Sequence, residues 1–507
     1  MHLRKLSLCR HSVSVSIVLL ALAVAVMLTS PARAQSAQPQ TSLVKLSKDT
    51  FKNSSSQHAT EVEPDTYAYG SEIVTAFQVG RISGGGSSDI GFATSTDAGA
   101  TWKHGYLPGI TTFYKGGKYD AASDAAVVYD ADHGVWLISS LGLANTNVVL
   151  ANSSSDGLTW NNPAVVDNTS GYADKDWITC DNTSTSPYYG HCYIEWEDAG
   201  NGDQVRMSTS TDGGQTWSKA FNVPNAIGLG GQPVAQPNGT AVVPFWGFAN
   251  SEIQFYTSTN GGKTWGNVGT ISTVTDHEMA GNLRGFYPLP SAELDGAGTV
   301  YVVWQDCRFR KNCSSNDIVM STSSDGKTWS KVSRIPIDAV SSTVDHFIPG
   351  IGVDPSTSGT TAHLVLTYYF YPVANCTAAT CQLGVGFVSS TDGGKTWTHG
   401  KTLTKGMNVS WLPSTSLGQM VADYISTSFV NGKAFGVFAK ASQPTSKFNE
   451  AMFTPAVGLI EEENGPYFSS EADRPVPNAK SDHGPMKFWD SDGKLPRPEQ
   501  PIAPQQH

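Results

Sequence analysis

The stretch Ser210-Thr211-Asp212-Gly213-Gly214-Gln215-Thr216-Trp217 decides how this sequence is interpreted. Its pattern, Ser-x-Asp-x-Gly-x-Thr-Trp, returns around five other residues. The copies at Asp156 and Asp325 are one residue shorter, and one copy has Asn in place of Asp. Six near-copies of one motif in a single chain indicate an internally repeated architecture. The other five copies are centred on Asp97, Asp156, Asn260, Asp325 and Asp392.

Each copy has the composition of a tight turn between two strands. An Asp or Asn side chain accepts hydrogen bonds from the backbone N–H groups just ahead of it, which closes the loop. Gly supplies the positive φ that such a turn requires, and the Trp that follows can pack beneath it. Because the polar atoms of the turn are used locally, we expect the copies to be scaffold and not catalytic residues.

A strand-like run rich in β-branched or aromatic residues precedes each turn, and a shorter segment often ending in Asp and Gly precedes each run. The repeat is therefore strand, turn, strand, loop, strand, turn, strand. Four antiparallel strands per repeat are typical of a β-propeller blade, so we predict an all-β propeller. The runs are 73–79, 135–140, 193–197, 241–248, 300–305, 363–371 and 433–438.

The number of blades depends on what is counted. The turns number six, whereas the strand pairs number seven, because the run 433–438 has no turn of this type after it. We favour seven blades, since 433–438 matches its predecessors and is followed by one more candidate strand, 451–455. In the alternative, with six blades, this last pair would be an addition outside the propeller.

The two ends of the chain differ in composition from the repeats. Residues 1–34 combine basic residues, an apolar run and Ala32-Arg33-Ala34, as in a cleaved secretory signal peptide. The run is short for a retained membrane anchor, which is the alternative. We expect a flexible leader at 35–60, the propeller at 61–457 and a Pro-rich polar tail at 458–507. No other long apolar stretch occurs, so we predict a secreted or periplasmic monomer without a membrane span after cleavage.

The charge and the cysteine content further restrict the class of protein and its possible partners. The chain has a formal net charge of −11, and removal of the basic signal peptide makes it more acidic. Such acidity argues against nucleic acid as a partner, because phosphate binding needs a basic field. The six cysteines outside the signal peptide form three sequence-local couples without zinc-finger spacing, and local pairing is their simplest disulfide arrangement. These couples are Cys180 with Cys192, Cys307 with Cys313, and Cys376 with Cys381.

The six turns resemble the Asp box, or bacterial neuraminidase repeat. Over about residues 61–457 the chain resembles the sialidase superfamily of propeller proteins. For a true sialidase, the resemblance implies three arginines that clamp the substrate carboxylate, an Asp acid/base, and a Tyr nucleophile assisted by Glu. The family's early Arg-Ile-Pro signature is absent here, and Arg81-Ile82-Ser83 matches it only in part. Related propellers cleave other glycans, bind carbohydrates or serve as receptors, so the resemblance does not fix the function.

Ligands of propellers bind where the innermost strands enter the central channel, and that position holds polar residues in nearly every predicted blade. Asp174 and Asp176 are the candidate acid/base residues. The candidate second carboxylate is Asp124 or Asp345, and the candidate nucleophile is Tyr424 or Tyr287. The candidates for substrate binding are Arg284, Tyr287, Lys175, Asp345 and His346. The same register also contains Glu63, Asp65, Asp120, Gln232, Gln419 and Asp423.

These residues predict a secreted glycoside hydrolase that acts on a glycan or glycoconjugate at the axial face. The alternative is a non-catalytic propeller that binds carbohydrate or protein through the same face. Neither function requires a cofactor. Four of the acidic residues are also of the type that binds Ca²⁺, which takes oxygen ligands in flexible numbers. These four are Asp120, Asp124, Asp174 and Asp176.

Overall fold

Nearly all regular structure in this protein is β-strand, as the sequence predicts. The computed structural model describes residues 41–285, 288–459, 468–469 and 474–476. Within these ranges the only helical elements are four short 3-10 turns, and every pair of named strands is antiparallel. None of the helices in these ranges is long and apolar enough to cross a membrane. The predicted signal peptide lies outside the described residues.

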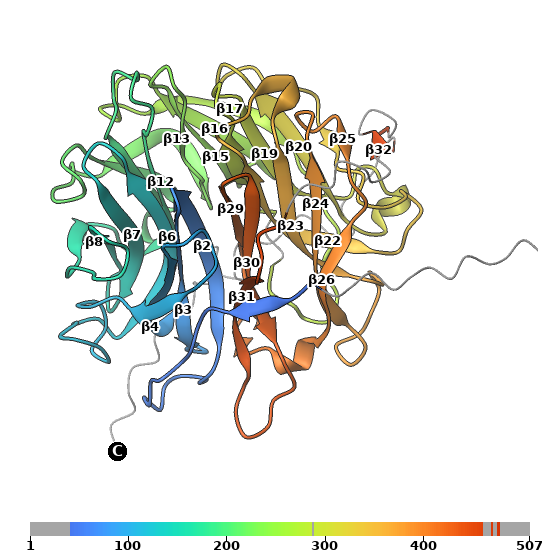
Figure 1. Ribbon diagram of the computed structural model, residues 1–507, viewed down its shortest axis with the longest axis horizontal. Coiled ribbons are helices and arrows are strands. Elements are labelled where there is room, and N and C mark those ends of the chain that lie inside the picture. Colours follow the sequence, from blue (N-terminus) through green and yellow to red (C-terminus); the bar gives the residue numbers. More distant parts are fainter. Residues whose placement is uncertain (1–40, 286–287, 460–467, 470–473, 477–507) are drawn as a thin grey trace, which may run out of the picture. The chain divides into compact units, whose positions relative to one another are not determined.

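The strands form groups of four in chain order (Figure 1). In the first six groups, neighbouring strands are joined by hydrogen bonds in the order of the sequence, as expected for repeated antiparallel units. The first group contains β2 (Glu61–Tyr69), β3 (Glu72–Arg81), β4 (Ser87–Ser95) and β5 (Lys103–Tyr106). The second contains β6 (Ala121–Asp130), β7 (Val135–Leu143), β8 (Val148–Ser154) and β9 (Ala164–Asp167). The third contains β10 (Ala173–Cys180), β11 (Cys192–Asp198), β12 (Gln204–Ser210) and β13 (Phe221–Leu229).

The remaining groups follow the same plan, and within the described residues the groups number seven. The fourth contains β14 (Val234–Ala235), β15 (Ala241–Gly247), β16 (Glu252–Ser258) and β17 (Gly266–Thr273). The fifth contains β18 (Ser291–Leu294), β19 (Val300–Asp306), β20 (Asp317–Ser323) and β21 (Ser333–Arg334). The sixth contains β22 (Asp345–Val353), β23 (Leu364–Tyr371), β24 (Gln382–Ser390) and β26 (Lys401–Asn408). The seventh contains β29 (Ser426–Val430), β30 (Lys433–Ala441), β31 (Glu450–Pro455) and β1 (Leu43–Lys45).

The seventh group takes its outer strand from the beginning of the chain. Leu43 lies opposite Pro455, and the hydroxyl of Ser47 accepts a hydrogen bond from the backbone N–H of Met452 at 2.8 Å. Leu46 is buried in the core. The prediction of a flexible leader is therefore wrong for residues 41–60. The physical reason is that the last repeat supplies three strands, so β31 would be left as an unpaired edge without β1.

The Asp boxes form the turns that the sequence predicts. In the copy at Asp212, the carboxylate accepts hydrogen bonds from Thr216 N–H at 2.9 Å and from the Ser210 hydroxyl at 2.9 Å. The indole N–H of Trp217 donates to the carbonyl of Gly214 at 3.2 Å. The φ of Gly214 is 77°, in the left-handed region that favours glycine. The polar atoms of the turn are thus used within the turn.

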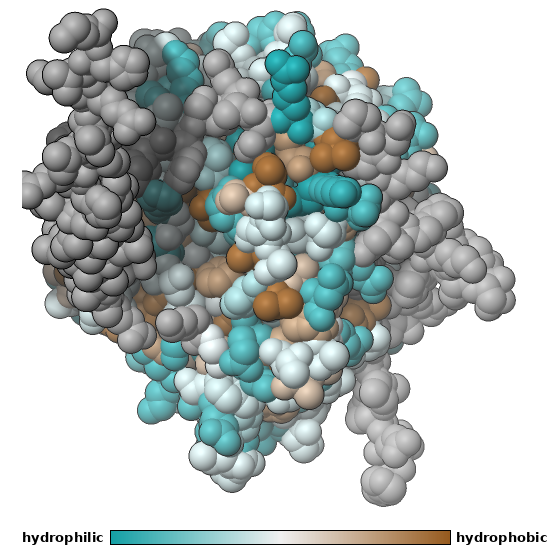
Figure 2. Space-filling view, turned by 90° about the vertical axis from the view of Figure 1, so that its right-hand side faces the viewer, coloured by the Kyte–Doolittle hydropathy of each residue, from teal (hydrophilic) through white to brown (hydrophobic). Residues whose placement is uncertain are grey.

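Two other features tie loops to the sheets. The three disulfides have the predicted local pairing, Cys180–Cys192, Cys307–Cys313 and Cys376–Cys381. Parts of the predicted tail contact the sheets, because Leu459 forms a β-bridge with Ala434 and β32 (Phe468–Ser469) pairs with β25 (Thr396–Trp397). A further short pair joins β27 (Ser414–Thr415) to β28 (Gly418–Gln419). On the face in Figure 2, hydrophobic residues are interspersed with hydrophilic ones.

The first strand of every group, or the residues that lead into it, lines one central cavity. This convergence brings residues far apart in the sequence to a common axis, and it positions the site described below. The lining residues come from β2 (Asp65 to Tyr67), β6 (Val127, Val128), β10 (Trp177 to Thr179), the start of β14 (Gln232 to Val234), β18 (Ser291 to Glu293), β22 (Ile351) and the start of β29 (Ile425, Ser426).

Candidate functional site

Four of these first strands carry a β-bulge near their start, at equivalent places. In each case the hydrogen-bond register shifts and one residue adopts a left-handed φ, between 38° and 55°. Such a conformation is uncommon for a residue other than glycine, and a bulge re-aims the side chain that it carries. Three of the four residues are ionisable, which marks this level of the axis as a candidate site. The residues are Glu63, Asp124, Lys175 and Ile348.

Lys175 is the centre of the site. Its Nζ lies 3.3 Å from Glu63 Oε1, 3.3 Å from Asp124 Oδ1 and 2.7 Å from Asp423 Oδ2. The lysine and its three partners are all buried. They come from different first strands or, for Asp423, from the segment before β29, so the ion cluster exists only in the folded protein.

Arg284 adds a second cation to the cluster. Its Nε donates to Asp423 Oδ1 at 3.0 Å and its Nη2 donates to Asp423 Oδ2 at 2.7 Å. This is a bidentate pair, in which the planar guanidinium matches the carboxylate. Asp423 is thus held between Arg284 and Lys175. Burial opposes ionisation of Asp423, but these two cations lower its pKa well below the ordinary value.

The other carboxyl groups of the cluster differ in protonation. Burial raises the pKa of Asp124, but Lys175 outweighs it and the net shift is downward. Burial raises the pKa of Glu63 to about 8, although Lys175 acts against the shift. At neutral pH, Asp124 is therefore ionised, whereas Glu63 holds its proton. The pKa of Lys175 is lowered by burial, yet Asp124, Asp423 and Glu63 raise it well above its ordinary value.

Asp174 is the partly exposed residue at the edge of this cluster. Burial, followed by repulsion from Asp124, raises its pKa to about 7. A hydrogen bond between the two carboxyl groups acts in the same direction on Asp174 and lowers the pKa of Asp124. The sequence predicts Asp174 and Asp124 as a pair of carboxyl groups, and in the structure they lie side by side with opposite pKa shifts.

A small cavity opens beside Asp174, and it is named the Asp174 cavity here. Glu63, Lys175 and Arg284 contribute to its wall. Arg81, the last residue of β3, also lines it, and its Nε contacts Met420 Sδ at 3.0 Å. The complete lining consists of Glu63, Arg81, Gly85, Gly86, Ser123, Leu143, Asn147, Tyr172, Asp174, Lys175, Arg284 and Leu417.

The arginines that line this cavity number two among the described residues, Arg81 and Arg284. The other four arginines of the repeat region pair with acidic groups elsewhere, and Arg206 and Arg334 are buried. Buried aspartates hold these two arginines. The pairs are Arg206 with Asp167 and Asp198, Arg308 with Asp306, and Arg310 and Arg334 with Asp317 and Asp338.

Tyr424 packs beside the cluster but lacks the surroundings of an activated nucleophile. Its ring lies 5.7 Å from Lys175 Nζ and 5.0 Å from the ring of Trp177. Its hydroxyl accepts a hydrogen bond from the backbone N–H of Ala125 at 3.2 Å. Burial, followed by the negative field of Glu63, raises the pKa of the phenol well above its ordinary value. The phenol therefore stays protonated.

Asp176 lies deeper than Asp174, and neither of its carboxyl oxygens has a hydrogen-bond partner. Burial raises its pKa well above the ordinary value, so it is a neutral acid. Glu195 and Glu197 of β11 are also buried, and burial raises their pKa values strongly. Sequence reasoning missed both glutamates, because they alternate with apolar residues in a strand that reads as core.

Two predicted binding residues, Asp345 and His346, are not brought to this cavity. Asp345 accepts a hydrogen bond from Asn316 N–H at 2.6 Å, and the Nε2 of His346 lies 3.7 Å from Asp338 Oδ2. The bulge of β22 falls later, at Ile348, so that an apolar side chain takes the equivalent position. Tyr287 lies outside the described residues.

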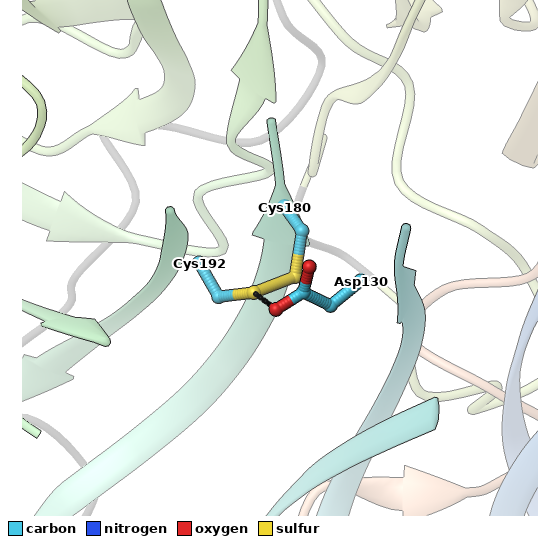
Figure 3. A group of neighbouring side chains, drawn as sticks. All are labelled: Asp130, Cys180 and Cys192. Carbon is cyan, nitrogen blue, oxygen red and sulfur yellow. Dashed lines mark hydrogen bonds between the residues drawn. A yellow bond between two sulfur atoms is a disulfide. The ribbon is translucent and has the colours of Figure 1, made fainter. Parts of the chain in front are cut away.

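Two groups of metal-ligand side chains occur close together in the described part of the chain. In the first, the carboxylate of Asp130 points at the Cys180–Cys192 disulfide (Figure 3), which offers no thiolate to a metal. In the second, Asp317 and Asp338 lie near His346, but Arg310 and Arg334 already compensate their charge. Neither donor set fits a metal ion. Within the axial cluster, Lys175 supplies the positive charge that a bound cation would bring.

A larger cavity lies toward the other end of the first strands. Its volume is about 320 Å³, and Tyr67, Thr179, Glu293 and Phe429 are in its wall. No lysine, arginine or histidine lines it in the described part of the chain. It is thus a second opening of the axis, chemically unlike the Asp174 cavity with its cationic side chains.

The family comparison agrees with the repeats. Residues 188–350 match the family model described as "BNR repeat-like domain". The resemblance to the sialidase superfamily, inferred from the Asp boxes, is thereby confirmed. A search of curated proteins found no match to this chain.

Several solved structures are similar over most of the chain. One is a PL25 polysaccharide lyase, an ulvan lyase bound to -[GlcA(1-4)Rha3S]-, with 12% identity, a TM-score of 0.48, and 86% of this chain and 100% of that chain covered. The NanB sialidase of Streptococcus pneumoniae has 14% identity and a TM-score of 0.40, covering 82% of this chain and 71% of that chain. The intramolecular trans-sialidase of Ruminococcus gnavus has 13% identity and a TM-score of 0.38, covering 81% and 97%. At these identities, no residue role carries over to this chain.

Proposed function

We propose that the seven four-stranded groups are the blades of one β-propeller, and that this propeller is an exported glycoside hydrolase whose active site is the Asp174 cavity. The convergence of all seven first strands on one cavity supports the propeller. The three disulfides support an oxidising compartment. The match of residues 188–350 to a BNR repeat-like domain supports a glycan as the ligand class.

The observation that carries the catalytic proposal is the pairing of Asp174 with Asp124. A carboxyl group with a pKa of about 7 holds a proton at neutral pH, whereas its neighbour Asp124 is ionised. Two carboxyl groups whose environments push their pKa values apart are suited to act as acid and base. Asp174 is also the partly exposed member of the cluster, so it is the one that a substrate reaches.

In this mechanism, Asp174 donates its proton to the glycosidic oxygen as the C–O bond breaks. Asp124 does not line the cavity, but its carboxylate, which Lys175 holds ionised behind the cavity wall, stabilises through its negative field the positive charge that develops on the sugar. Water then adds to the sugar carbon, and its proton returns to Asp174. We assign Tyr424 the role of a positioning residue that packs against Lys175, because its phenol stays protonated.

The test is hydrolysis of a panel of 4-methylumbelliferyl glycosides by the wild type and by Asp174→Asn. Loss of a general acid is expected to lower kcat by about 10²–10⁴-fold. The activity of the wild type should fall above about pH 7, as Asp174 loses its proton. Asp203→Asn is the matched control: burial also raises the pKa of Asp203 to about 7, its φ of 59° suits Asn, and it does not line the cavity. An Asp174→Asn enzyme as active as the wild type would refute the assignment.

A second candidate function is glycan or protein binding without catalysis. The observation that favours it is the saturation of Lys175 by three carboxyl groups and the bidentate pairing of Arg284 with Asp423. Cations engaged in this way stabilise the fold and do not form an open clamp for a substrate carboxylate. Under this alternative the wild type binds a glycan and leaves it intact, and Asp174→Asn binds it equally well.

A further inference from the structure

The cavity of about 320 Å³ toward the other end of the first strands is called the rear cavity here. Its volume is at the lower end of the range of about 300–1,000 Å³ that is usual for small-molecule sites. It shares no lining residue with the Asp174 cavity. Trp177 lies between the two along β10, and its ring packs edge-on against Tyr424 at a centroid distance of 5.0 Å. The rear cavity is therefore a separate space of ligand size that the proposed catalytic site does not use.

The wall of the rear cavity is acidic. Glu293 of β18 and Asp295 just after that strand contribute to it, and no lysine, arginine or histidine does so in the described part of the chain. The carboxylate of Asp295 is engaged by the loops around it, since it accepts hydrogen bonds from the backbone N–H groups of Ala297, Thr299 and Gly359. Glu293 is thus the carboxyl group that can meet a ligand.

The side chain of Glu293 extends from β18 toward the axis. Its strand neighbours Ala292 and Leu294 pack into the apolar core, so Glu293 lies on the other face of β18. Glu293 is partly exposed, and it lines both the rear cavity and the central cavity. Asp65 and Tyr67 of β2 face it and interact with it electrostatically. The strands β10, β14, β22 and β29 contribute no ionisable side chain to either wall in the described ranges.

The two carboxyl groups that face each other here lack a cation. Burial, followed by the field of Asp65, raises the pKa of Glu293 to about 8. Burial also raises the pKa of Asp65 to about 7. A carboxyl group in such surroundings keeps its proton because its charged form is poorly solvated, and a positive charge nearby reverses this effect. A cation that enters the rear cavity therefore gains a counter-ion as Glu293 releases its proton.

We propose that the rear cavity binds a small organic ammonium compound, with the carboxylate of Glu293 as its counter-ion. Tyr67 and Phe429 also line the cavity, and aromatic rings attract ammonium groups. A divalent metal ion fits less well, because it needs several oxygen ligands at about 2.0–2.6 Å. Asp65, Glu293 and Asp295 do not form a group close enough to share one ion.

The experiment is isothermal titration calorimetry of the full chain with n-butylamine hydrochloride at several pH values. A primary aliphatic amine keeps its charge up to about pH 10. We expect the affinity to rise by about tenfold or more between about pH 6 and pH 8, because Glu293 must lose its proton before it can pair with the amine. At neutral pH, titrations in two buffers with different heats of ionisation should show a net release of protons. n-Butanol, which lacks the charge, should bind about tenfold more weakly or not at all.

Glu293→Gln removes the counter-ion. This variant should lose about tenfold or more in affinity for n-butylamine, together with most of the pH dependence. It should remain folded, because glutamine is neutral, as Glu293 is in the empty cavity at neutral pH, and thermal unfolding checks this. Glu61→Gln is the matched control, since burial also raises the pKa of Glu61 to about 7 and Glu61 lines neither cavity. Its affinity for the amine should equal that of the wild type.

The inference is overturned if the wild type does not bind n-butylamine, if Glu293→Gln binds it as tightly as the wild type, or if n-butanol binds equally well. Displacement of the amine by calcium chloride would also overturn it and assign the cavity to a metal ion. Should Glu293→Gln fail to fold, the proton release of the wild type still decides the question. Asp174→Asn should bind n-butylamine like the wild type, so failure of the proposed catalytic function would leave this result unchanged.

Discussion

Replacing Lys175 by methionine tests whether the axial ion cluster stabilises the fold. Methionine has a similar length and, like lysine, is unbranched at Cβ, so the left-handed φ of 52° is no harder to adopt. The ammonium group that lies among Glu63, Asp124 and Asp423 is lost. Removing one partner of a buried ion pair costs about 3–5 kcal/mol, because the remaining charge is buried without compensation.

The structure places the expected loss at the lower end of that range. Asp423 keeps its two hydrogen bonds to Arg284. Glu63 holds its proton at neutral pH, since its pKa is about 8. Asp124 is thus the charge that loses its compensation, and we expect a loss of about 3 kcal/mol at pH 7.

The pH dependence gives the sharper result. In the wild type the pKa of Asp124 is lowered, so its contribution to stability is present above the unfolded value and is lost as pH falls through the folded value. In Lys175→Met, the strongest influence that opposes burial of Asp124 is lost, so the pKa of Asp124 rises and the variant takes up a proton earlier as pH falls. The difference in stability between the two proteins should therefore shrink as pH falls from 7 toward 4.

Urea unfolding followed by tryptophan fluorescence at several pH values measures both quantities. Lys440→Met is the control, since the Nζ of Lys440 lies 3.4 Å from the Ser442 hydroxyl and 5.1 Å from the Phe453 ring centroid, and no carboxylate of the described residues pairs with it. That change should cost less than about 1 kcal/mol. Equal stability of Lys175→Met and the wild type, or a loss that does not change with pH, would contradict this account of the cluster.

Three further changes test the scaffold. Ser47→Ala removes a hydroxyl that donates to Glu61 Oε2 at 2.8 Å and tethers β1, and it should cost about 2 kcal/mol in urea unfolding; an unchanged midpoint would show that the contact does not hold the strand. Asp212→Ala opens one Asp box and should cost about 1 kcal/mol while leaving glycan binding on a glycan microarray intact, so a loss of binding would assign the turn a function. Replacing Cys180 and Cys192 together by serine removes a link across 12 residues. The unfolded chain gains entropy, so the free energy of unfolding should fall by about 3 kcal/mol. A variant that unfolds at the same temperature as the wild type would contradict this expectation.

The local features of the fold could be predicted from the sequence because their causes are local. The turn at Asp212 is closed by atoms within a few residues of one another, and the cysteine couples are near neighbours in the chain. The strand runs were visible because β-branched and aromatic residues gather in them. The origin of β1 was not visible, since nothing in the polar composition of 35–60 shows that three residues of it complete a sheet formed by the other end of the chain.

The residues of the site could be predicted from the sequence only where the register of the strands could be predicted. Asp124 and Lys175 were found because polar residues at the start of innermost strands stand out. The bulges were not visible, and one of them places Ile348 at the level where we expected Asp345.

The pairing of β1 with β31 constrains the order in which parts of this protein can fold during synthesis. The last sheet cannot be completed until the segment around Pro455 has been synthesised. β1 therefore has no strand to pair with until almost the whole chain has been made. Until then, β31 and its neighbours remain open to pairing with another molecule. A circular permutant that carries residues 41–60 behind residue 459 converts this longest-range pair into a nearby one. Its lower contact order should make it refold faster than the natural chain.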